Sequence, residues 1–389
     1  MGTALLFIII LSILVIVHEA GHFFAAKFFG MRVYEFGIGF PPRAIGWYKD
    51  PNTKKWVRVK RKSKSTITNT SASAAREEEY PGTVYSLNWL PLGGFVKVKG
   101  ENGEEAAEPD SFAYHSAWKR LVVLVAGVFM NVVLAALVLG VGFMAGLPAD
   151  FSEGVDSRAI VVQAPQVTIQ QVIADSPAQE AGFKFGDKII AVGGTEVATS
   201  GDMIAQVQSR AGEPTEFTVM RGEERLSIMA TPEIDQEDNI ARIGAVLADA
   251  GVIRYPWYEA VWRGIVGAIF GFINIVIGFY LLIKNLLLGQ GLIFEVAGPV
   301  GIAVIIGESA RLGFSYLLNI TAMISLSLAV INIMPIPALD GGRAFFVILE
   351  KIFGRRFSMK YEQLAHTIGF VLLLFLILVI TTRDVLNLF

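Results

Sequence analysis

Long apolar runs are the feature that most constrains this chain. Residues 4–17 carry no charge, and after one polar cluster the chain stays largely apolar to Phe29. Residues 121–147 form a second uncharged run, broken only by Asn131, and further runs cover 316–334 and 367–380. A helix of about 20 apolar residues crosses the roughly 30 Å hydrocarbon core of a bilayer. The sequence therefore predicts a membrane protein with about four transmembrane helices.

Composition supports this interpretation and excludes other classes. Only 17% of the residues are charged, against about a quarter in soluble domains. The formal net charge of −2 gives no indication of nucleic-acid binding. The first run lacks the basic start and small-residue cleavage site of a signal peptide, so we expect a retained helix. The chain has no cysteine, which excludes disulfides and thiolate metal sites and leaves His, Asp, Glu and backbone oxygen as metal ligands.

One stretch has the composition of a soluble domain. Between residues 159 and 233 apolar alternation marks strands at 167–169, 188–192 and 216–220, separated by turn signals. A helix is predicted around 201–210. These signals together indicate a small β-rich module.

Basic loops predict the orientation in the membrane. Lys and Arg are frequent between residues 43 and 76, around a Ser/Thr/Asn-rich middle that favours a flexible loop, and again between 351 and 360. Both loops are expected on the cytoplasmic side, which places the β-rich module outside. Residues 257–288 are apolar but interrupted by polar side chains. They form either an amphipathic helix on the outer face, which we favour, or an extra hairpin with 292–306.

The first apolar run contains a pair of histidines with metal-ligand spacing. His18 and His22 are four residues apart, so on a helix both imidazoles project from one face and can bind one ion. Glu19 lies between them and points elsewhere, which suits a general base better than a ligand. One alternative is a buried polar cluster that only packs. The other is the proton relay of a transporter, because ionisable residues within a membrane cost free energy to insert and usually serve a function.

A catalytic zinc needs a third protein ligand. Asp340 is the candidate, because it follows an apolar run and two helix-breaking prolines, Pro335 and Pro337, and precedes Gly341-Gly342, which permit close backbone approach. The alternative is an ordinary loop aspartate. The two remaining histidines, His115 and His366, are isolated in the sequence, so each is expected to be an interfacial or core residue.

Residues 92–99 alternate in the manner of a strand and contain Gly93 and Gly94, which permit close approach of another backbone. An edge strand beside the metal would pair with an unwound substrate and satisfy its amides, for which lipid offers no partner. The expectation is that this strand binds substrate.

These motifs together resemble those of the site-2 protease family of intramembrane zinc metalloproteases, in the bacterial regulator-of-sigma-E branch. The paired motifs are HExxH at His18–His22 and NxxPxPxLDG at Asn332–Gly342, and both stand without a gap. Further similarity covers membrane-associated hairpins at 34–43 and 90–101, a Gly-Pro-x-x-Ile stretch at 298–302 and a PDZ module at 159–233. The resemblance extends over virtually the whole chain.

The resemblance implies roles for individual residues. His18, His22 and Asp340 would bind Zn²⁺, Glu19 would be the general base, and Asn332 would help to hold the substrate backbone. The chain departs from the family in two respects. Some relatives have two PDZ modules, whereas the length of this chain allows one. It also has Ser327 where close relatives often place a second asparagine, which leaves the clamping role of that position in question.

The predicted fold is a polytopic α-helical membrane protein with membrane-associated β-hairpins and one extracytoplasmic PDZ domain, located in the bacterial inner membrane. Its predicted function is hydrolysis of peptide bonds within transmembrane segments of substrates such as anti-sigma factors or signal-peptide remnants. The alternatives are a proton-coupled transporter and a catalytically inactive scaffold that displays a PDZ domain.

The predicted segments are transmembrane helix 1 at 1–29, a cytoplasmic-side loop with hairpins at 30–117, helix 2 at 118–147, the PDZ domain at 158–235, an apolar or amphipathic region at 252–315, helix 3 at 316–350 and helix 4 at 364–382.

Overall fold

The structure of the chain is a computed structural model. It describes residues 2–59, 80–101, 103, 106–152, 154–173, 175–235, 240–289, 297–354 and 359–386. The predicted flexible segment at 63–75 and the basic residues Arg355 and Arg356 lie outside this part of the chain. The chain divides into two compact units, the first comprising Met1–Ala136, Val266–Gly307 and Thr321–Phe389 and the second Leu137–Ile265 and Glu308–Ile320.

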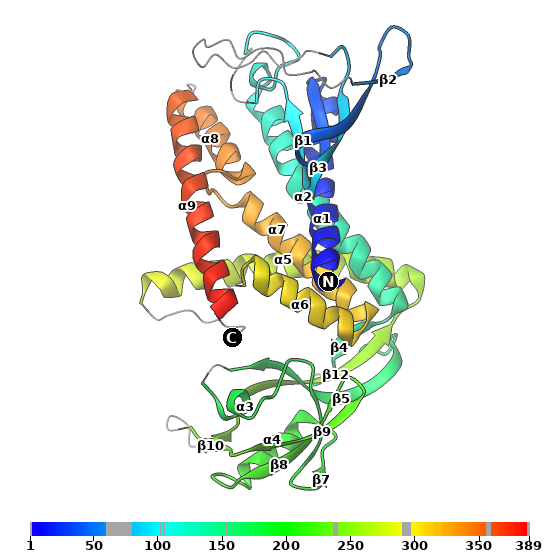
Figure 1. Cartoon of the computed structure of the whole chain (residues 1–389), viewed down its shortest axis with the longest axis vertical. Helices are drawn as coiled ribbons and strands as arrows, with labels where there is room; N and C mark the ends of the chain where they lie inside the picture. The colour runs from blue at the N-terminus through cyan, green and yellow to red at the C-terminus, as the bar shows by residue number, and fades with distance from the viewer. Residues whose placement is uncertain are drawn as a thin grey trace. The chain divides into compact units, whose positions relative to one another are not determined.

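Long apolar helices form most of the first unit (Figure 1). Five described helices are long and apolar enough to cross a membrane, whereas the sequence predicted about four spans. The additional helix is α5, because its interior is free of charge between Arg263 near its start and Lys284 near its end. The five are α1 (Gly2–Phe28), α2 (Ala117–Ala145), α5 (Trp257–Leu287), α7 (Phe314–Ile333) and α9 (Met359–Leu386).

Two shorter helices complete this helical part. Helix α6 (Pro299–Leu312) has 14 residues, too few to cross the hydrocarbon core and so to form a spanning hairpin with α5. Helix α8 (Asp340–Phe353) follows α7 after a break at residues 334–339. The segment 316–350 therefore contains two helices, with the break at the predicted position, because Pro335 and Pro337 interrupt the helical hydrogen bonds between them.

Helices α1 and α2 approach closely at Gly21. A Cβ atom built on Gly21 would lie 2.3 Å from the carbonyl oxygen of Ala126, so only glycine permits this contact. Near the last turn of α1 a buried apolar cluster joins Ala26, Val123 of α2 and Val347 of α8. The contacts fix the part of α1 that carries the histidines against its neighbours.

A small sheet lies along α1. It has the order β2–β1–β3, formed by β2 (Trp56–Arg58), β1 (Val33–Lys49) and β3 (Val84–Val98). Instead of two separate local hairpins at 34–43 and 90–101, these segments pair with each other, with Phe36 opposite Val96 and Gly37 opposite Phe95. The pairing spans about 60 residues of sequence, which local patterns do not reveal.

The second unit contains the β-rich module. Its sheet has the order β4–β12–β5–β6–β8–β9, with β7 paired to β6. The predicted strands fall within β5, β6 and β8, and the predicted helix is α4 (Ser200–Gln208), which begins at a capping box formed by Thr199 and Asp202. The strands are β4 (Leu147–Asp150), β5 (Ile160–Val172), β6 (Lys188–Val192), β7 (Thr195–Glu196), β8 (Thr215–Arg221), β9 (Glu224–Ala230) and β12 (Ala245–Arg254).

The core of this unit consists of buried apolar side chains. Phe217, Val219 and Ile169 are fully buried, and Phe183 packs edge-on against Phe217 with ring centroids 5.4 Å apart. The sheet continues beyond the predicted range 158–235, because β12 pairs with both β5 and β4. The remaining small elements are the one-turn helix α3 (Pro177–Glu180), the 3₁₀ turn η1 (Phe112–Tyr114), and the short strands β10 (Glu233–Ile234) and β11 (Ala241–Arg242).

Candidate metal centre

Three side chains from distant parts of the chain converge in the first unit. The Nε2 atoms of His18 and His22 lie 3.1 Å apart, and each lies within 3.1 Å of Oδ2 of Asp340, at 2.8 and 3.1 Å. Both imidazoles are buried, and the carboxylate is mostly covered. Within the described residues, these three are a group of ligand atoms close enough to hold one ion.

The geometry and chemistry of this group fit zinc. Two imidazole nitrogens and a carboxylate oxygen are ligands that zinc prefers, with bond lengths of about 2.0–2.2 Å. In a tetrahedral site such ligands are separated by about 3.3 to 3.5 Å, and the observed separations of 2.8–3.1 Å are slightly shorter.

Gly127 of α2 leaves the space beside the imidazoles open. A Cβ atom at this position would lie 2.5 Å from Nε2 of His22 and 2.7 Å from Nε2 of His18. No heavy atom tolerates that separation from a ring nitrogen without displacement. Glycine at 127 therefore clears the volume next to the two ligand nitrogens.

The far sides of both imidazoles are held by α2. Nδ1 of His22 lies 2.8 Å from the carbonyl oxygen of Val123, so it donates to that oxygen and Nε2 is left for a metal. Nδ1 of His18 lies 3.3 Å from the side-chain amide of Asn131, a fully buried residue whose Oδ1 has no partner among the described residues. Turning this amide by 180° directs its oxygen at Nδ1 and gives His18 the same tautomer.

The carboxylate of Asp340, the predicted third ligand, is positioned by a folded-back loop. Asp340 is the first residue of α8, where the helix dipole favours a negative charge. Gly341 packs so tightly on the preceding loop that a Cβ atom would lie 2.1 Å from the carbonyl oxygen of Met334. The close backbone approach predicted for Gly341 and Gly342 is therefore an approach to the loop that precedes α8 in the same chain.

His366 also contributes to this arrangement, although it looked isolated in the sequence. Its Nδ1 accepts the backbone N–H of Ala338, two residues before Asp340, at 2.9 Å. Gly369, one turn further along α9, packs against Pro337 of the same loop. Helix α9 therefore supports the ligand loop, while His115 lies outside the group of ligand atoms.

Glu19 lies beside the three ligands without joining them. Its Oε2 accepts the backbone N–H of Val96 in β3 at 3.0 Å, which holds the carboxylate toward the sheet side of α1. A cavity of about 230 Å³ opens next to it, which is large enough for water. The cavity is lined by Val15, His18, Glu19, Asn131, Leu328, Asn332, Ala338, Leu339 and Asp340.

The predicted substrate-binding residues separate into two places. Asn332 lines the cavity together with Glu19 and Asp340. Gly93 and Gly94 are not among the lining residues. They lie against the middle of α1, where Cβ atoms would come within 3.3 Å of Val15 and 3.4 Å of Ile16.

Sequence reasoning did not identify Gly127 or Asn131 as site residues. A signal for Asn131 was present, since it is the one polar interruption of the second apolar run. Gly127 carried no comparable signal, because a glycine in an apolar helix is common and its contact with two imidazoles exists only after α1 and α2 pack.

Fold and site together indicate a multi-pass membrane protein with a candidate His–His–Asp metal centre next to a half-buried glutamate. The model of Peptidase family M50 matches the chain at residues 6–56 and 73–376. The chain belongs to this peptidase family, and the resemblance inferred from its two motifs is confirmed.

Relatives of similar length match nearly the whole chain. A protein named as a candidate zinc metalloprotease in Clostridium perfringens is 30% identical over 96% of this chain and 96% of its own length. One with the same description in Fusobacterium nucleatum is 30% identical over 100% of this chain and 99% of its own length. The zinc metalloprotease RasP of Geobacillus kaustophilus is 26% identical over 97% of this chain and 96% of its own length.

Among solved structures, the PDZ domain of an SdrC-like protein from Listeria monocytogenes is similar at 21% identity, covering 23% of this chain and 95% of that chain with a TM-score of 0.21. A likeness at this level does not establish the fold of the second unit, and the PDZ assignment stays a prediction.

Proposed function

We propose that this chain is an intramembrane zinc endopeptidase that hydrolyses peptide bonds within transmembrane segments of other membrane proteins. The observation that carries the proposal is the convergence of His18, His22 and Asp340 beside Glu19 and a cavity, on helices apolar enough to cross a membrane. Membership of Peptidase family M50 favours this function over the alternatives of a proton-coupled transporter and an inactive scaffold.

The roles of the residues follow from their positions. Two imidazoles and the Asp340 carboxylate would hold the ion, and zinc would supply the Lewis acidity that polarises a peptide carbonyl and acidifies water. Glu19 takes the proton from that water and returns it to the leaving amine. The N–H of Val96 holds the Glu19 carboxylate in place beside the cavity that Glu19 lines.

Substrate positioning is assigned to Asn332 and to β3. Asn332 lines the cavity, so its amide can donate to and accept from an unwound peptide backbone there. Strand β3 lies along α1 next to Glu19, and Gly93 and Gly94 let it approach the helix. We assign to this strand the pairing with substrate amides that lose their helical hydrogen bonds.

We assign the chain to the bacterial inner membrane, with both basic loops in the cytoplasm and the second unit outside as a PDZ domain that filters or binds substrates. This orientation requires α5 to lie along the outer membrane surface rather than cross. Within the first unit, α5 runs across the directions of α1 and α9 (Figure 1), which supports that placement. Anti-sigma factors and signal-peptide remnants are the proposed kinds of substrate.

The test is cleavage of a model transmembrane substrate in detergent by Glu19→Gln. This variant keeps the size and hydrogen bonding of residue 19 but cannot accept a proton, so zinc content should stay near one per chain while cleavage falls by about 100- to 10,000-fold. Glu223→Gln, which changes an exposed glutamate of the second unit, is the matched control. Near-normal cleavage by Glu19→Gln would refute the assigned role of Glu19.

A further inference from the structure

The small sheet of the first unit presents an exposed face on which tryptophans and cations alternate. In the ribbon formed by β1 and β2, Trp47 lies opposite Arg58, and Lys49 lies opposite Trp56. Opposed residues share a face, as do residues two apart on one strand, so all four side chains project the same way. Each of the four is exposed, and the two indoles have exposed fractions of 39% and 60%. We call these four residues the Trp–cation face.

The other side of this ribbon is packed, so the exposure is confined to one face. Tyr48 and Val57, which alternate with the four residues, are half-buried. Tyr48 stacks on Tyr80 with ring centroids 5.2 Å apart. The ribbon is therefore amphipathic, but it is the exposed face that carries the large aromatic surface.

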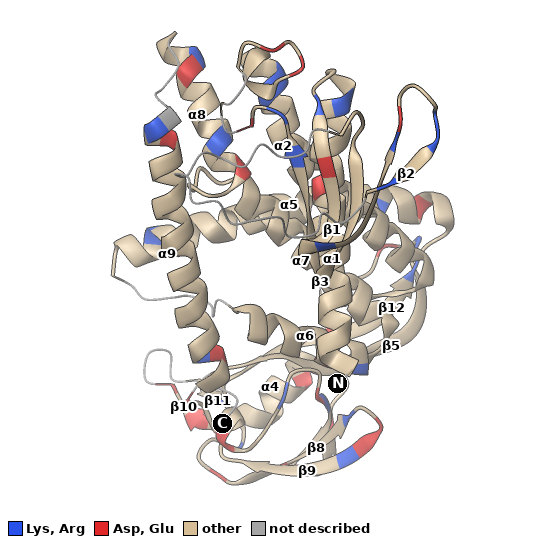
Figure 2. Ribbon diagram, turned by 45° about the horizontal axis from the view of Figure 1, so that its top comes forward, with Lys and Arg blue, Asp and Glu red and all other residues tan. Residues whose placement is uncertain are grey.

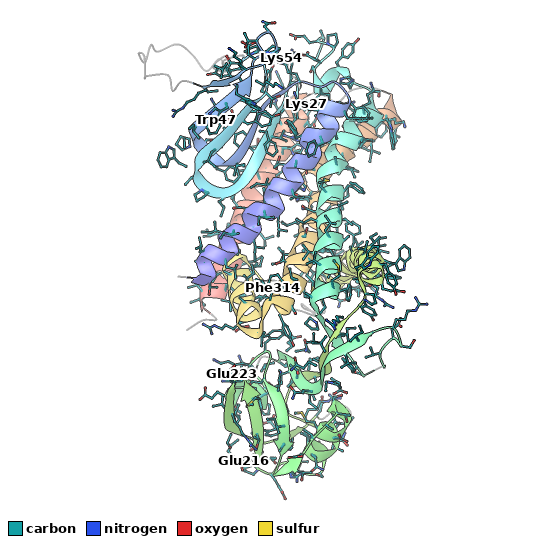
Figure 3. The ribbon with its side chains drawn as sticks, turned by 90° about the vertical axis from the view of Figure 1, so that its right-hand side faces the viewer. Lys27, Trp47, Lys54, Glu216, Glu223 and Phe314 are labelled. Carbon is teal, nitrogen blue, oxygen red and sulfur yellow. The ribbon has the colours of Figure 1, made fainter. Side chains whose placement is uncertain are left out.

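Ring contacts place the Trp–cation face at the end of α1. The Trp56 ring contacts Tyr85 at 5.7 Å, and Tyr85 contacts Phe23 of α1 at 6.0 Å. Phe23 lies five residues before the end of α1, and Lys27 is in its last turn. Figure 3 shows Trp47 and Lys54 projecting from the sheet at the end of α1 where Lys27 lies. For a helix that crosses a membrane, this end is at the headgroup level.

The same face of the sheet becomes wholly apolar toward the middle of α1. Beyond Tyr85, the side chains that follow on this face of β3 are Leu87 and Trp89, which are 48% and 66% exposed. Further along the strand, Gly93 donates its N–H to Ser12 in the middle of α1, at 3.3 Å. Over about 13 Å, at roughly 3.3 Å per strand residue, the exposed surface thus changes from tryptophan with cations to apolar side chains alone.

The charge near the Trp–cation face is positive. Residues 47–58 contain four cations, Lys49, Lys54, Lys55 and Arg58, and one carboxylate, Asp50. The Asp50 carboxylate accepts the N–H groups of Asn52 and Thr53 in the connecting turn. Neither Lys49 nor Arg58 forms an ion pair with another described residue. Figure 2 shows basic positions, coloured blue, on the ribbon around β2.

We propose that the Trp–cation face binds the anionic headgroups of the leaflet at the C-terminal end of α1. Indole rings prefer the headgroup region, where they meet both apolar and polar surroundings, and Lys49 and Arg58 bind phosphate oxygens there. The apolar continuation at Leu87 and Trp89 enters the acyl region. A soluble acidic partner would match the cations but not this change of polarity along α1. Bound headgroups fix the sheet in depth, and with it the strand that contacts Glu19.

The test uses the full chain, whose lack of cysteine permits a single Thr53→Cys label at the exposed turn. The label is an environment-sensitive fluorophore, and the protein is studied in mixed micelles of phosphatidylcholine with an increasing fraction of phosphatidylglycerol. We expect the emission to shift to shorter wavelength as the anionic fraction rises. Each cation contributes about fivefold to the affinity for an anionic surface, so Lys49→Gln with Arg58→Gln should lose most of the emission shift over the same range of anionic fraction.

The matched control replaces two exposed cations of the second unit, Lys184→Gln with Arg225→Gln, and should leave the titration unchanged. Trp47→Ser with Trp56→Ser should weaken the shift while its dependence on the anionic fraction remains. Thermal unfolding of each variant shows whether it is folded. Identical emission in neutral and anionic micelles, or an unchanged titration in the Lys49/Arg58 variant, overturns the proposal. The readout requires no proteolysis, so it is separate from the test of the proposed activity.

Discussion

At the scale of single residues, the proposed metal centre depends on three residues of α2. Gly127 has no Cβ atom that would occupy the space beside the Nε2 atoms of the two imidazoles. On the opposite sides of the rings, Val123 and Asn131 contact the Nδ1 atoms. Partners of this kind fix the tautomer and orientation of metal-binding imidazoles. Each of these contributions can be removed without touching a ligand.

Gly127→Ala should abolish zinc binding. Its Cβ atom would lie 2.5–2.7 Å from the two Nε2 atoms, so the imidazoles or the helix must move by about an ångström. Alanine is also the best helix former, which argues against unfolding as the cause. We expect metal content, measured by atomic absorption, to fall from about one zinc per chain to less than a tenth of that. Gly140→Ala on the same helix meets only ordinary contacts at 3.6 Å and should retain zinc.

Asn131→Ala should weaken zinc binding while the three ligands remain. Loss of an outer hydrogen-bond partner of a metal-bound histidine typically costs 10- to 100-fold in affinity. Asn131→Asp keeps an acceptor oxygen for Nδ1 of His18 and should restore most of it. The measurement is competition with a fluorescent zinc chelator. Equal affinity for Asn131→Ala and the unchanged chain would show that the contact does not orient His18.

At the scale of elements, the position of Asp340 is set by the packing of α8. Its N-terminus is held by the folded-back loop and by α9 through His366 and Gly369. Its C-terminal half is joined to α2 by an ion pair between Arg120 and Glu350 at 2.7 Å, with both side chains largely buried. A second ion pair joins Arg343 of α8 to Glu101. The helix that carries the third ligand is thus fixed at both ends.

Glu350→Ala should destabilise the chain by about 3–5 kcal/mol, because it removes the ion-pair partner of the largely buried Arg120 guanidinium. Denaturant unfolding in detergent measures the change. Replacing both partners by leucine should recover most of the loss, since removing a buried pair together is close to neutral. An unfolding midpoint for Glu350→Ala equal to that of the unchanged chain would show that the pair does not hold α8.

At the scale of the whole molecule, the proposed orientation concerns which side of the membrane each unit faces. The two basic loops can share one side only if the helices between them cross an even number of times. Helices α2 and α7 satisfy this condition when α5 lies along the surface, and a crossing α5 would break it. The placement of α5 therefore decides the orientation of everything after it.

Single cysteines test this topology, because the chain has none of its own. In intact cells, an impermeant reagent added outside should label Glu223→Cys in the second unit but neither Lys54→Cys nor Lys351→Cys. All three positions are exposed. Labelling of Lys54→Cys would reverse the orientation, and labelling of Lys351→Cys alone among the basic loops would mean that α5 crosses.

Local features of the sequence were enough to predict several properties of the protein. Apolar runs predict helices because a membrane leaves the backbone no other partner, and the spacing of His18 and His22 follows from the pitch of any helix. The prolines after α7 end it for local steric reasons. The two motifs carried the family resemblance, which the match to Peptidase family M50 confirms.

Only the tertiary structure decided what depends on pairs distant in sequence. Two segments predicted as separate hairpins became partners in one sheet, since strand pairing is set by contacts that no local pattern encodes. The chain folds back after the break at residues 334–339, so that Asp340 begins a new helix and lies beside His18, 322 residues away. The roles of Gly127, Asn131 and His366 arise from packing between helices, where one missing Cβ atom or one buried amide matters only because a particular neighbour lies against it.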